Sequence, residues 1–302
     1  MAKIWEQYPW YNFLLGYVRL MTRSCFRSVR SEGVEHIPRQ GAVLLAPNHC
    51  ATLMDPLMQL QLTKPIGFGA RSDIFAKPRT ARILRWLRIV PLARERNGLA
   101  EVAKNFEVFD EIIDCLDHDV PFCMYAEGMH RAERGMLPMK KGIFRIAKMA
   151  SEKLGRPVYI VPIGTNYEDF FRGQTRVRMR VGEPMEITQE LARREGKPEA
   201  EIYRELCEDL RARDLALIGD PMTRKRLPRA IRVMLSVLSL PLFALCAVGA
   251  LPISLPYLII MRGMKDKAWS HTVRFALHLV LPLFVPFHMG YERLLNSYRE
   301  LF

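Results

Sequence analysis

A histidine and an aspartate follow one short apolar run closely enough to act together. Residues 47–56 read PNHCATLMDP and come directly after the apolar residues 42–46, AVLLA. Imidazole titrates near neutral pH, and a carboxylate can fix its tautomer. His49 and Asp55 could therefore serve as a general base with an orienting partner.

The spacing of His49 and Asp55 restricts how their side chains can meet. Six residues along a continuous helix turn by about 600°, which places the two side chains on different faces. They can pair only if a turn intervenes, and the step from Asp55 to Pro56 allows one because the residue before proline favours extended angles. The alternative is that Asp55 only caps a helix through residues 57–62, LMQLQL, and that His49 has no chemical role.

Three further strand-like segments end in residues suited to an anion. Residues 90–96, VPLARER, lead into Arg94 and Arg96, which could clamp a phosphate or lie on the surface. Residues 125–131, YAEGMHR, place Glu127 and Gly128 after a strand, and Lys140 follows shortly before a helix that begins near a glycine. Residues 161–167, VPIGTNY, end another strand.

Taken together and in this order, the four segments resemble the motif blocks of the glycerophospholipid acyltransferase family, whose members acylate glycerol-3-phosphate or lysophosphatidate. The resemblance implies that His49 deprotonates the acceptor hydroxyl and that Asp55 orients it. An acyl thioester, on coenzyme A or an acyl carrier protein, would donate the chain, without a metal or other cofactor. The residues that the resemblance assigns to the phosphate-bearing acceptor are Arg94, Arg96, Glu127, Gly128 and Lys140.

The segment departs from the common family pattern at several positions. Its H-x5-D spacing replaces H-x4-D and resembles a branch that also carries L-P-x-K-x-G, as residues 137–142 do. Ala126 stands where proline is usual, and residues 129–131, MHR, replace the usual Thr-Arg or Ser-His, so the acceptor contacts of this loop stay open. Cys50 adjoins His49, but adjacent residues of an extended chain point to opposite faces, so we expect no covalent acyl-enzyme.

The pattern around these motifs predicts a mixed α/β fold with a mostly buried sheet flanked by helices, because short apolar runs alternate with helical stretches. We expect four units. They are an N-terminal interfacial helix (1–32), an acyltransferase α/β domain (33–187), a charged and solvated helical appendix (188–229) and a membrane-associated apolar helical hairpin (230–302). The strands are predicted at 42–46, 66–70, 89–92, 121–126, 158–164 and 176–181, and helices at 99–115 and 143–153.

Both ends of the chain carry residues typical of a membrane interface. The first helix has aromatic residues on one side and arginines near its end, which suits an interface or simple packing on the domain. Residues 233–261 hold no charge, and residues 275–291 form a second apolar run, but prolines interrupt both. We expect broken, shallowly inserted or re-entrant helices with basic flanks on anionic headgroups; a buried core subdomain is the alternative.

The composition limits the function classes. Lysine and arginine number 45 against 32 acidic residues, a net charge of +13, so the surface should attract anions. Nucleic acid is not expected, because the basic residues are dispersed and no binding motif is present. The six scattered cysteines favour reduced thiols and an active site that faces the cytoplasm. The alternatives are another lysolipid or amino-acid lipid acceptor, and a non-catalytic membrane-binding relative.

Overall fold

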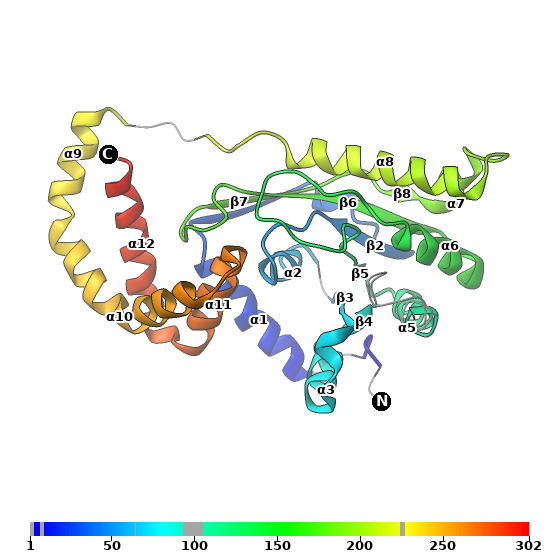
Figure 1. The fold of residues 1–302 in the computed structure, drawn as a ribbon, viewed down its shortest axis with the longest axis horizontal. Helices are drawn as coiled ribbons and strands as arrows, with labels where there is room; N and C mark the ends of the chain where they lie inside the picture. The colour runs from blue at the N-terminus through cyan, green and yellow to red at the C-terminus, as the bar shows by residue number, and fades with distance from the viewer. Residues whose placement is uncertain (1–2, 7–8, 64, 93–104, 224–226, 302) are drawn as a thin grey trace.

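The computed structural model describes residues 3–6, 9–63, 65–92, 105–223 and 227–301. Within these ranges, eight strands form one sheet in the order β1-β7-β6-β2-β5-β3-β4, with β8 paired to β6 (Figure 1). The sheet confirms the predicted mixed α/β fold. The strands are β1 (Ser28–Glu32), β2 (Ala42–Pro47), β3 (Gly67–Arg71), β4 (Ile89–Leu92), β5 (Phe122–Cys123), β6 (Val158–Tyr167), β7 (Arg176–Val181) and β8 (Met185–Glu186).

The strands that carry the sequence motifs run in the same direction. Strands β6, β2, β5, β3 and β4 are parallel neighbours, whereas β7 runs antiparallel to β6. The carboxyl ends of parallel strands meet at one edge of a sheet, where ligands of α/β proteins commonly bind. The loops after β2, β5 and β6 therefore come together at that edge.

Strand β1 is a part of the sheet that the sequence pattern did not predict. It pairs in parallel with β7 at the end of the sheet, and its residues, SVRSE, are half-buried or exposed. An edge strand of this kind has no apolar run to reveal it. The proposed boundary between an N-terminal helix and the α/β domain at residue 32 is therefore wrong, because β1 belongs to the sheet.

Helices cover both faces of the sheet, as the alternation of buried side chains requires. Val43 and Leu45 of β2 point to one face, which is covered by α1 (Pro9–Ser24) and α2 (Met54–Gln59). Ala42 and Leu44 point to the other face, against α5 (Asn105–Asp117), α6 (Gly142–Leu154) and α8 (Glu199–Ile218). The short helices α3 (Pro78–Trp86) and α7 (Ile187–Ala192) complete this part.

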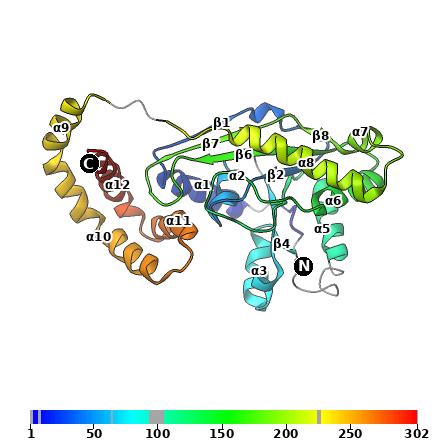
Figure 2. The ribbon, with the colours of Figure 1, turned by 45° about the horizontal axis from the view of Figure 1, so that its top comes forward.

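Helix α8 lies along the sheet and is not a solvated appendix (Figures 1 and 2). Its buried side chains include Leu206 and Leu210, which join the same core as β2 and α6. Gly164 of β6 lets the strand approach the end of α8, because a Cβ atom there would lie 2.4 Å from the backbone nitrogen of Ile218. The prediction of a separate charged unit over 188–229 is thus corrected: α8 has one apolar stripe, which its charged residues obscure in the sequence.

The C-terminal residues 229–301, called here the C-terminal unit, form a helical group beside the sheet (Figure 1). The apolar run 233–261 is divided at Ser239, two residues before Pro241, so the predicted interruption is present there. Pro252 and Pro256, in contrast, lie inside the helix Leu240–Gly263 and do not end it, which corrects that part of the prediction. The second apolar run is bent by 109° between its two helical parts. The elements are α9 (Arg229–Leu238), α10 (Leu240–Gly263), η4 (Lys267–Trp269), α11 (Ser270–Val280), η5 (Pro282–Phe284) and α12 (Val285–Arg299).

Candidate active site

His49 and Asp55 meet at the carboxyl end of β2. Nδ1 of His49 donates a hydrogen bond to Oδ2 of Asp55 over 2.7 Å. The carboxylate is fully buried, while the imidazole is 18% exposed and keeps Nε2 for another partner. This geometry is that of a general base whose tautomer is fixed by a carboxylate.

A tight turn between the two residues makes the pairing possible. Helix α2 begins only at Met54, and Thr52 before it has a left-handed backbone with φ of 50°. The intervening turn that the spacing required is therefore present. The alternative, in which Asp55 only caps the helix, is wrong. The N-cap residue is Leu53, and its side chain makes no capping hydrogen bond.

Asp55 accepts four hydrogen bonds from nitrogen and oxygen donors and a weak one from the Cys50 thiol, so its charge is well compensated although it is buried. Its Oδ2 also accepts from the backbone amides of Cys50 and Ala51, each at 2.7 Å. Its Oδ1 accepts from the hydroxyl of Tyr167, which ends β6, at 2.8 Å. Burial raises the pKa of Tyr167 well above its usual value, which keeps this hydroxyl protonated as a donor. A buried carboxylate with this many donors is a rigid partner for the imidazole.

Hydrogen bonds of the Asn48 and Glu127 side chains fix the backbone around His49. The buried side chain of Asn48 accepts from the Thr165 amide at 2.7 Å and donates to the Thr165 carbonyl at 3.1 Å, which ties the end of β2 to β6. The amide of His49 donates to Oε1 of Glu127 at 2.7 Å, and the other oxygen of Glu127 accepts from the Leu137 amide at 2.6 Å.

These contacts change the interpretation of Glu127. The resemblance assigned it to the acceptor, but both of its oxygens already bind backbone amides, and its side chain is buried. Burial raises the pKa of its carboxyl group, and the two backbone amides oppose that rise. The structure thus makes Glu127 a residue that positions His49 and the loop around Leu137.

Two aromatic rings flank the imidazole of His49. The Tyr125 ring stacks on it with 4.3 Å between ring centroids, and the His130 ring lies edge-on at 5.5 Å. The backbone amide of Arg131 donates to the His49 carbonyl at 3.3 Å. The loop after β5 therefore covers the base from one side, and Arg131 brings a half-exposed guanidinium to the same depression.

The remaining predicted site residues are Gly128, Lys140, Arg94 and Arg96, of which the structure describes the first two. Gly128 follows Glu127 with φ of 67°, in the left-handed region that favours glycine, so it turns the loop. Lys140 is exposed, and its backbone amide donates to the Ala126 carbonyl at 2.8 Å. Arg94 and Arg96 lie outside the described residues.

Cys50 is not an alternative nucleophile. Its thiol is buried, and burial together with the nearby Asp55 raises its pKa well above the usual value. A thiol is nucleophilic as the thiolate, which this environment suppresses. The imidazole of His49 therefore stays the predicted reactive group at this edge.

Several residues of the site were missed from the sequence. Tyr125, His130 and Arg131 lie in the motif segment after β5 and contact or adjoin His49. Their membership of this segment, which ends at the same edge of the sheet as His49, could have indicated them. Tyr167 ends the fourth segment, where its hydroxyl reaches Asp55. No group of three or more metal-binding side chains occurs within the described ranges.

Comparison with known proteins agrees with this geometry. Residues 28–166 match the family model described as Acyltransferase. The chain carries a domain of the Acyltransferase family. That match includes His49, Asp55 and Glu127, so the dyad lies within the acyltransferase domain.

The chain is similar to the crystal structure of the 1-acyl-sn-glycerophosphate (LPA) acyltransferase PlsC from Thermotoga maritima, with 22% sequence identity and a TM-score of 0.48. The similarity covers 71% of this chain and 83% of the Thermotoga protein. No match to the chain is found among curated proteins.

Proposed function

We propose that this acyltransferase transfers a fatty acyl chain from an acyl thioester to a hydroxyl group of a glycerol phosphate at a membrane surface. Lysophosphatidate (1-acyl-sn-glycerol-3-phosphate) is the first choice of acceptor and glycerol-3-phosphate the second, with acyl-CoA or acyl carrier protein as the donor. The observation that carries this proposal is the 2.7 Å hydrogen bond between His49 and the buried Asp55 within an acyltransferase domain.

The dyad supports a direct transfer. Nε2 of His49 takes the proton of the acceptor hydroxyl while the hydroxyl oxygen attacks the thioester carbonyl carbon. Collapse of the tetrahedral intermediate breaks the carbon–sulfur bond, and the imidazolium returns its proton to the leaving thiolate. Asp55 stabilises the imidazolium between these steps, and no acyl-enzyme forms.

Cationic side chains near His49 support a phosphate-bearing acceptor; Arg131 pairs with Glu133 at 3.1 Å in this structure, and a bound phosphate would replace that partner. Arg131 lies in the same depression as His49, and Lys140 follows in the chain beyond the Glu127 loop. Arginine and lysine are the side chains that bind phosphate most readily. Arg94 and Arg96 stay predicted acceptor contacts from the segment after β4.

The C-terminal unit supports association with a membrane. Helix α10 is long and apolar enough to cross a bilayer. Many of its apolar side chains are exposed, among them Leu245, Val248 and Ile259. An exposed apolar surface of this extent marks contact with lipid or with another protein.

The partner of α10 favours an in-plane or re-entrant position over a simple crossing. Helix α12 packs antiparallel to α10, because Phe243 near the start of α10 packs on Tyr298 near the end of α12, with 4.9 Å between ring centroids, while Gly249 farther along α10 lies against Phe287 near the start of α12. Arg293 of α12 donates to Gln174 of the α/β part, so α12 stays bound to the acyltransferase domain. We propose that α9 and α10 lie in the cytoplasmic leaflet; each of the six cysteines, all within described ranges, is a free thiol, which suits a reducing compartment.

The test is acyl transfer by purified protein in detergent from long-chain acyl-CoA or acyl carrier protein. Lysophosphatidate and glycerol-3-phosphate are assayed in parallel with an unphosphorylated lysolipid, and His49→Ala serves as the control. We expect transfer to a phosphorylated acceptor and a loss of about 10²- to 10⁴-fold in kcat for His49→Ala. Transfer only to unphosphorylated acceptors would overturn the acceptor class, and no transfer by folded wild-type protein would overturn the enzymatic proposal.

A further inference from the structure

The C-terminal unit, residues 229–301, lies beyond the segment 28–166 that matches the family model. Two of its side chains nevertheless reach the two segments that hold His49. One contacts the turn between His49 and Asp55, and the other contacts the loop after β5. These contacts join residues more than 130 positions apart in the sequence.

The first contact is between two threonine hydroxyls. Oγ1 of Thr52 lies 2.9 Å from Oγ1 of Thr272 at the start of α11, and both residues are buried. Thr52 has φ of 50°, a conformation that is costly for a β-branched residue and that persists only where the surroundings hold it. The neighbouring amides of Cys50 and Ala51 bind Asp55, so a relaxed Thr52 would move the groups that fix the dyad.

The second contact is a hydrogen bond with the ring beside the base. Nε2 of His130 lies 2.9 Å from Oδ2 of Asp266, which precedes η4. This hydrogen bond lowers the pKa of Asp266. The other oxygen of Asp266 accepts from the Ala268 amide at 2.9 Å, so the carboxylate is held by its own backbone. His130 in turn lies edge-on to His49.

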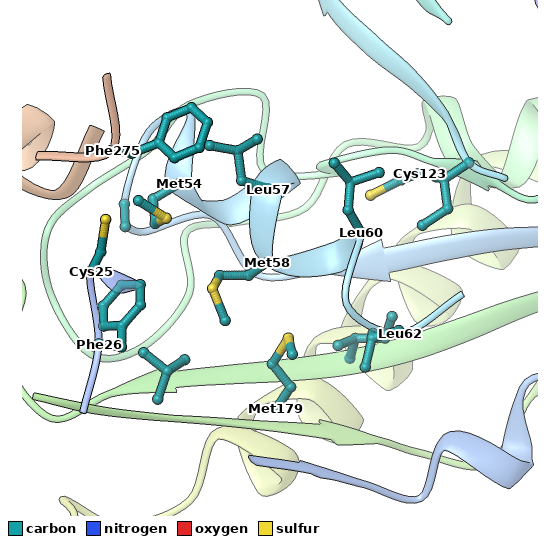
Figure 3. Close-up of a cluster of buried hydrophobic side chains, with 14 of the residues drawn as sticks. Cys25, Phe26, Met54, Leu57, Met58, Leu60, Leu62, Cys123, Met179 and Phe275 are labelled. Atoms are coloured by element: carbon teal, nitrogen blue, oxygen red, sulfur yellow. The ribbon is translucent and has the colours of Figure 1, made fainter. Parts of the chain in front are cut away.

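The C-terminal unit is packed firmly enough to hold both contacts together. Phe275 of α11 joins Met54 and Leu57 of α2 in one buried cluster, and Figure 3 shows these three side chains side by side. The hydroxyl of the buried Ser270 donates to the Phe171 carbonyl at 2.5 Å. Helix α11 is therefore docked on the helix that begins next to Asp55.

We propose that Thr272 and Asp266 are positioning residues for acyl transfer, supplied to the acyltransferase domain by the C-terminal unit. Thr272 holds the strained turn between His49 and Asp55, and Asp266 holds His130 beside the base. The dyad is fully aligned only when the C-terminal unit is docked. This inference rests on the proposed function for its catalytic readout.

The first experiment compares Thr272→Val with Thr272→Ser in the full chain. Valine keeps the shape and removes the hydroxyl, which leaves the buried hydroxyl of Thr52 without this partner. We therefore expect a folded protein with a lower melting temperature, a kcat about 3- to 10-fold lower and little change in KM. Serine keeps the hydroxyl and should restore most of the rate. Thr188→Val, on the exposed surface of α7, is the matched control and should behave as wild type.

The second experiment is a double-mutant cycle between Asp266→Asn and His130→Gln. If Asp266 acts through His130, the double variant loses no more activity than the stronger single variant. Asp110→Asn is the control, since Asp110 forms an exposed ion pair with Lys153. Fully additive losses, or wild-type kcat in both Thr272→Val and Asp266→Asn, would overturn the proposal.

Hydrogen–deuterium exchange separates this inference from the proposed function. In Thr272→Val, peptides that cover residues 48–56 should exchange faster than in wild type, whereas Thr188→Val should leave them unchanged. Wild-type protein that is inactive on every acceptor would overturn the proposed function, and exchange would still report on the positioning. Unchanged exchange in residues 48–56 together with unchanged kcat would overturn the inference itself.

Discussion

At the scale of single residues, the site is built to hold His49 and to leave one nitrogen available. Asp55 binds Nδ1, Glu127 binds the backbone amide, and Tyr125 stacks on the ring. Because these partners are buried or packed, the imidazole is already held in place before it accepts a proton, and little further ordering is needed during the reaction. Arg131, in contrast, lies half-exposed on the loop after β5 and pairs with Glu133.

Asp55→Asn tests whether the dyad needs the charge of Asp55 or only its shape. Asparagine can keep its oxygen at the position of Oδ2 and direct its amide toward the Tyr167 hydroxyl, so we expect a folded protein. The imidazolium loses its counter-charge, and kcat should fall about 10²-fold or more. Steady-state kinetics with thermal melting as the folding control measures this. A wild-type rate in Asp55→Asn would contradict the role of the carboxylate.

At the scale of elements, α8 is bound to β6 by an unusually close approach. The Cβ atom of any residue at position 164 would lie 2.4 Å from the Ile218 nitrogen and the Leu217 carbonyl carbon. Asn166 of the same strand donates to the Ile218 carbonyl at 2.7 Å. The helix that looked like a solvated unit is thus part of the core that supports the end of β6, from which Tyr167 reaches Asp55.

Gly164→Ala should destabilise the protein by about 1–3 kcal/mol, because backbone atoms of α8 must move to admit the methyl group. One kcal/mol lowers the melting temperature of a large domain by about 2–4 °C. Differential scanning fluorimetry measures the change. Gly16→Ala is the control, since nothing lies within 4 Å of a Cβ atom at this exposed helical position. Equal melting temperatures for the two variants would argue against tight packing of α8.

Because of Asp214 on α8, we expect the stability of the folded protein to depend on pH. Its carboxyl group is fully buried, and burial with the nearby Glu127 raises its pKa well above the usual value. A raised pKa in the folded state means that the stability linked to this group is present at low pH and is lost as the pH rises through the folded pKa. Asp214→Asn removes this loss.

We therefore expect the melting temperature of Asp214→Asn to exceed that of wild type by more at pH 8 than at pH 5. Thermal melts across this range measure the difference. Asp110→Asn, at an exposed position, should show a difference that does not grow with pH. An Asp214→Asn advantage that shrinks toward pH 8 would show that the carboxyl group is ionised in the folded protein at little cost.

At the scale of the whole molecule, the residues after α10 link the exposed apolar surface of α9 and α10 to the active site. Helix α10 ends at Gly263, and Asp266 already contacts His130 beside the base. The exposed apolar surface of α9 and α10 lies at the opposite end of the molecule from α7 (Figure 1). A membrane bound by this surface would therefore be linked to the site through the residues between Gly263 and Asp266.

Val248→Glu tests this surface. Val248 is 68% exposed on α10, and a charge there should weaken binding to vesicles that contain anionic lipid, by at least the cost of placing a carboxylate in an apolar layer. Sedimentation with vesicles of phosphatidylcholine and 20% phosphatidylserine measures the bound fraction. Thr188→Glu adds the same charge on α7 and should bind as wild type. Equal binding of both variants would move the membrane contact elsewhere.

The orientation of the C-terminal unit has its own test. A re-entrant position keeps the mostly exposed residues 262–267, between the end of α10 and the buried start of α11, on the side of the active site, so added protease should cleave this connector in sealed vesicles. Protection of the connector from the side that carries the active site would show that α10 crosses the bilayer.

The sequence by itself determined the position of most strands of the sheet and the place of the dyad. Apolar runs such as residues 89–92 and 176–181 matched β4 and β7, because buried strands need continuous or alternating apolar residues. The order of the four motif segments indicated that His49 and Asp55 form the dyad. This was possible because such chemistry needs particular residue types at particular positions near strand ends. The polar edge strand β1 and the apolar stripe of α8 carried no comparable local signal.

Only the tertiary structure decided what surrounds the dyad. Glu127 changed from an acceptor contact to a support of the His49 backbone, because hydrogen-bond partners follow from distance in space and not from motif membership. Thr272 and Asp266 lie far along the chain from the residues they contact, and nothing local in the sequence marks such pairs. Local patterns fix elements and strand-end chemistry, whereas contacts between distant segments depend on how the whole chain packs.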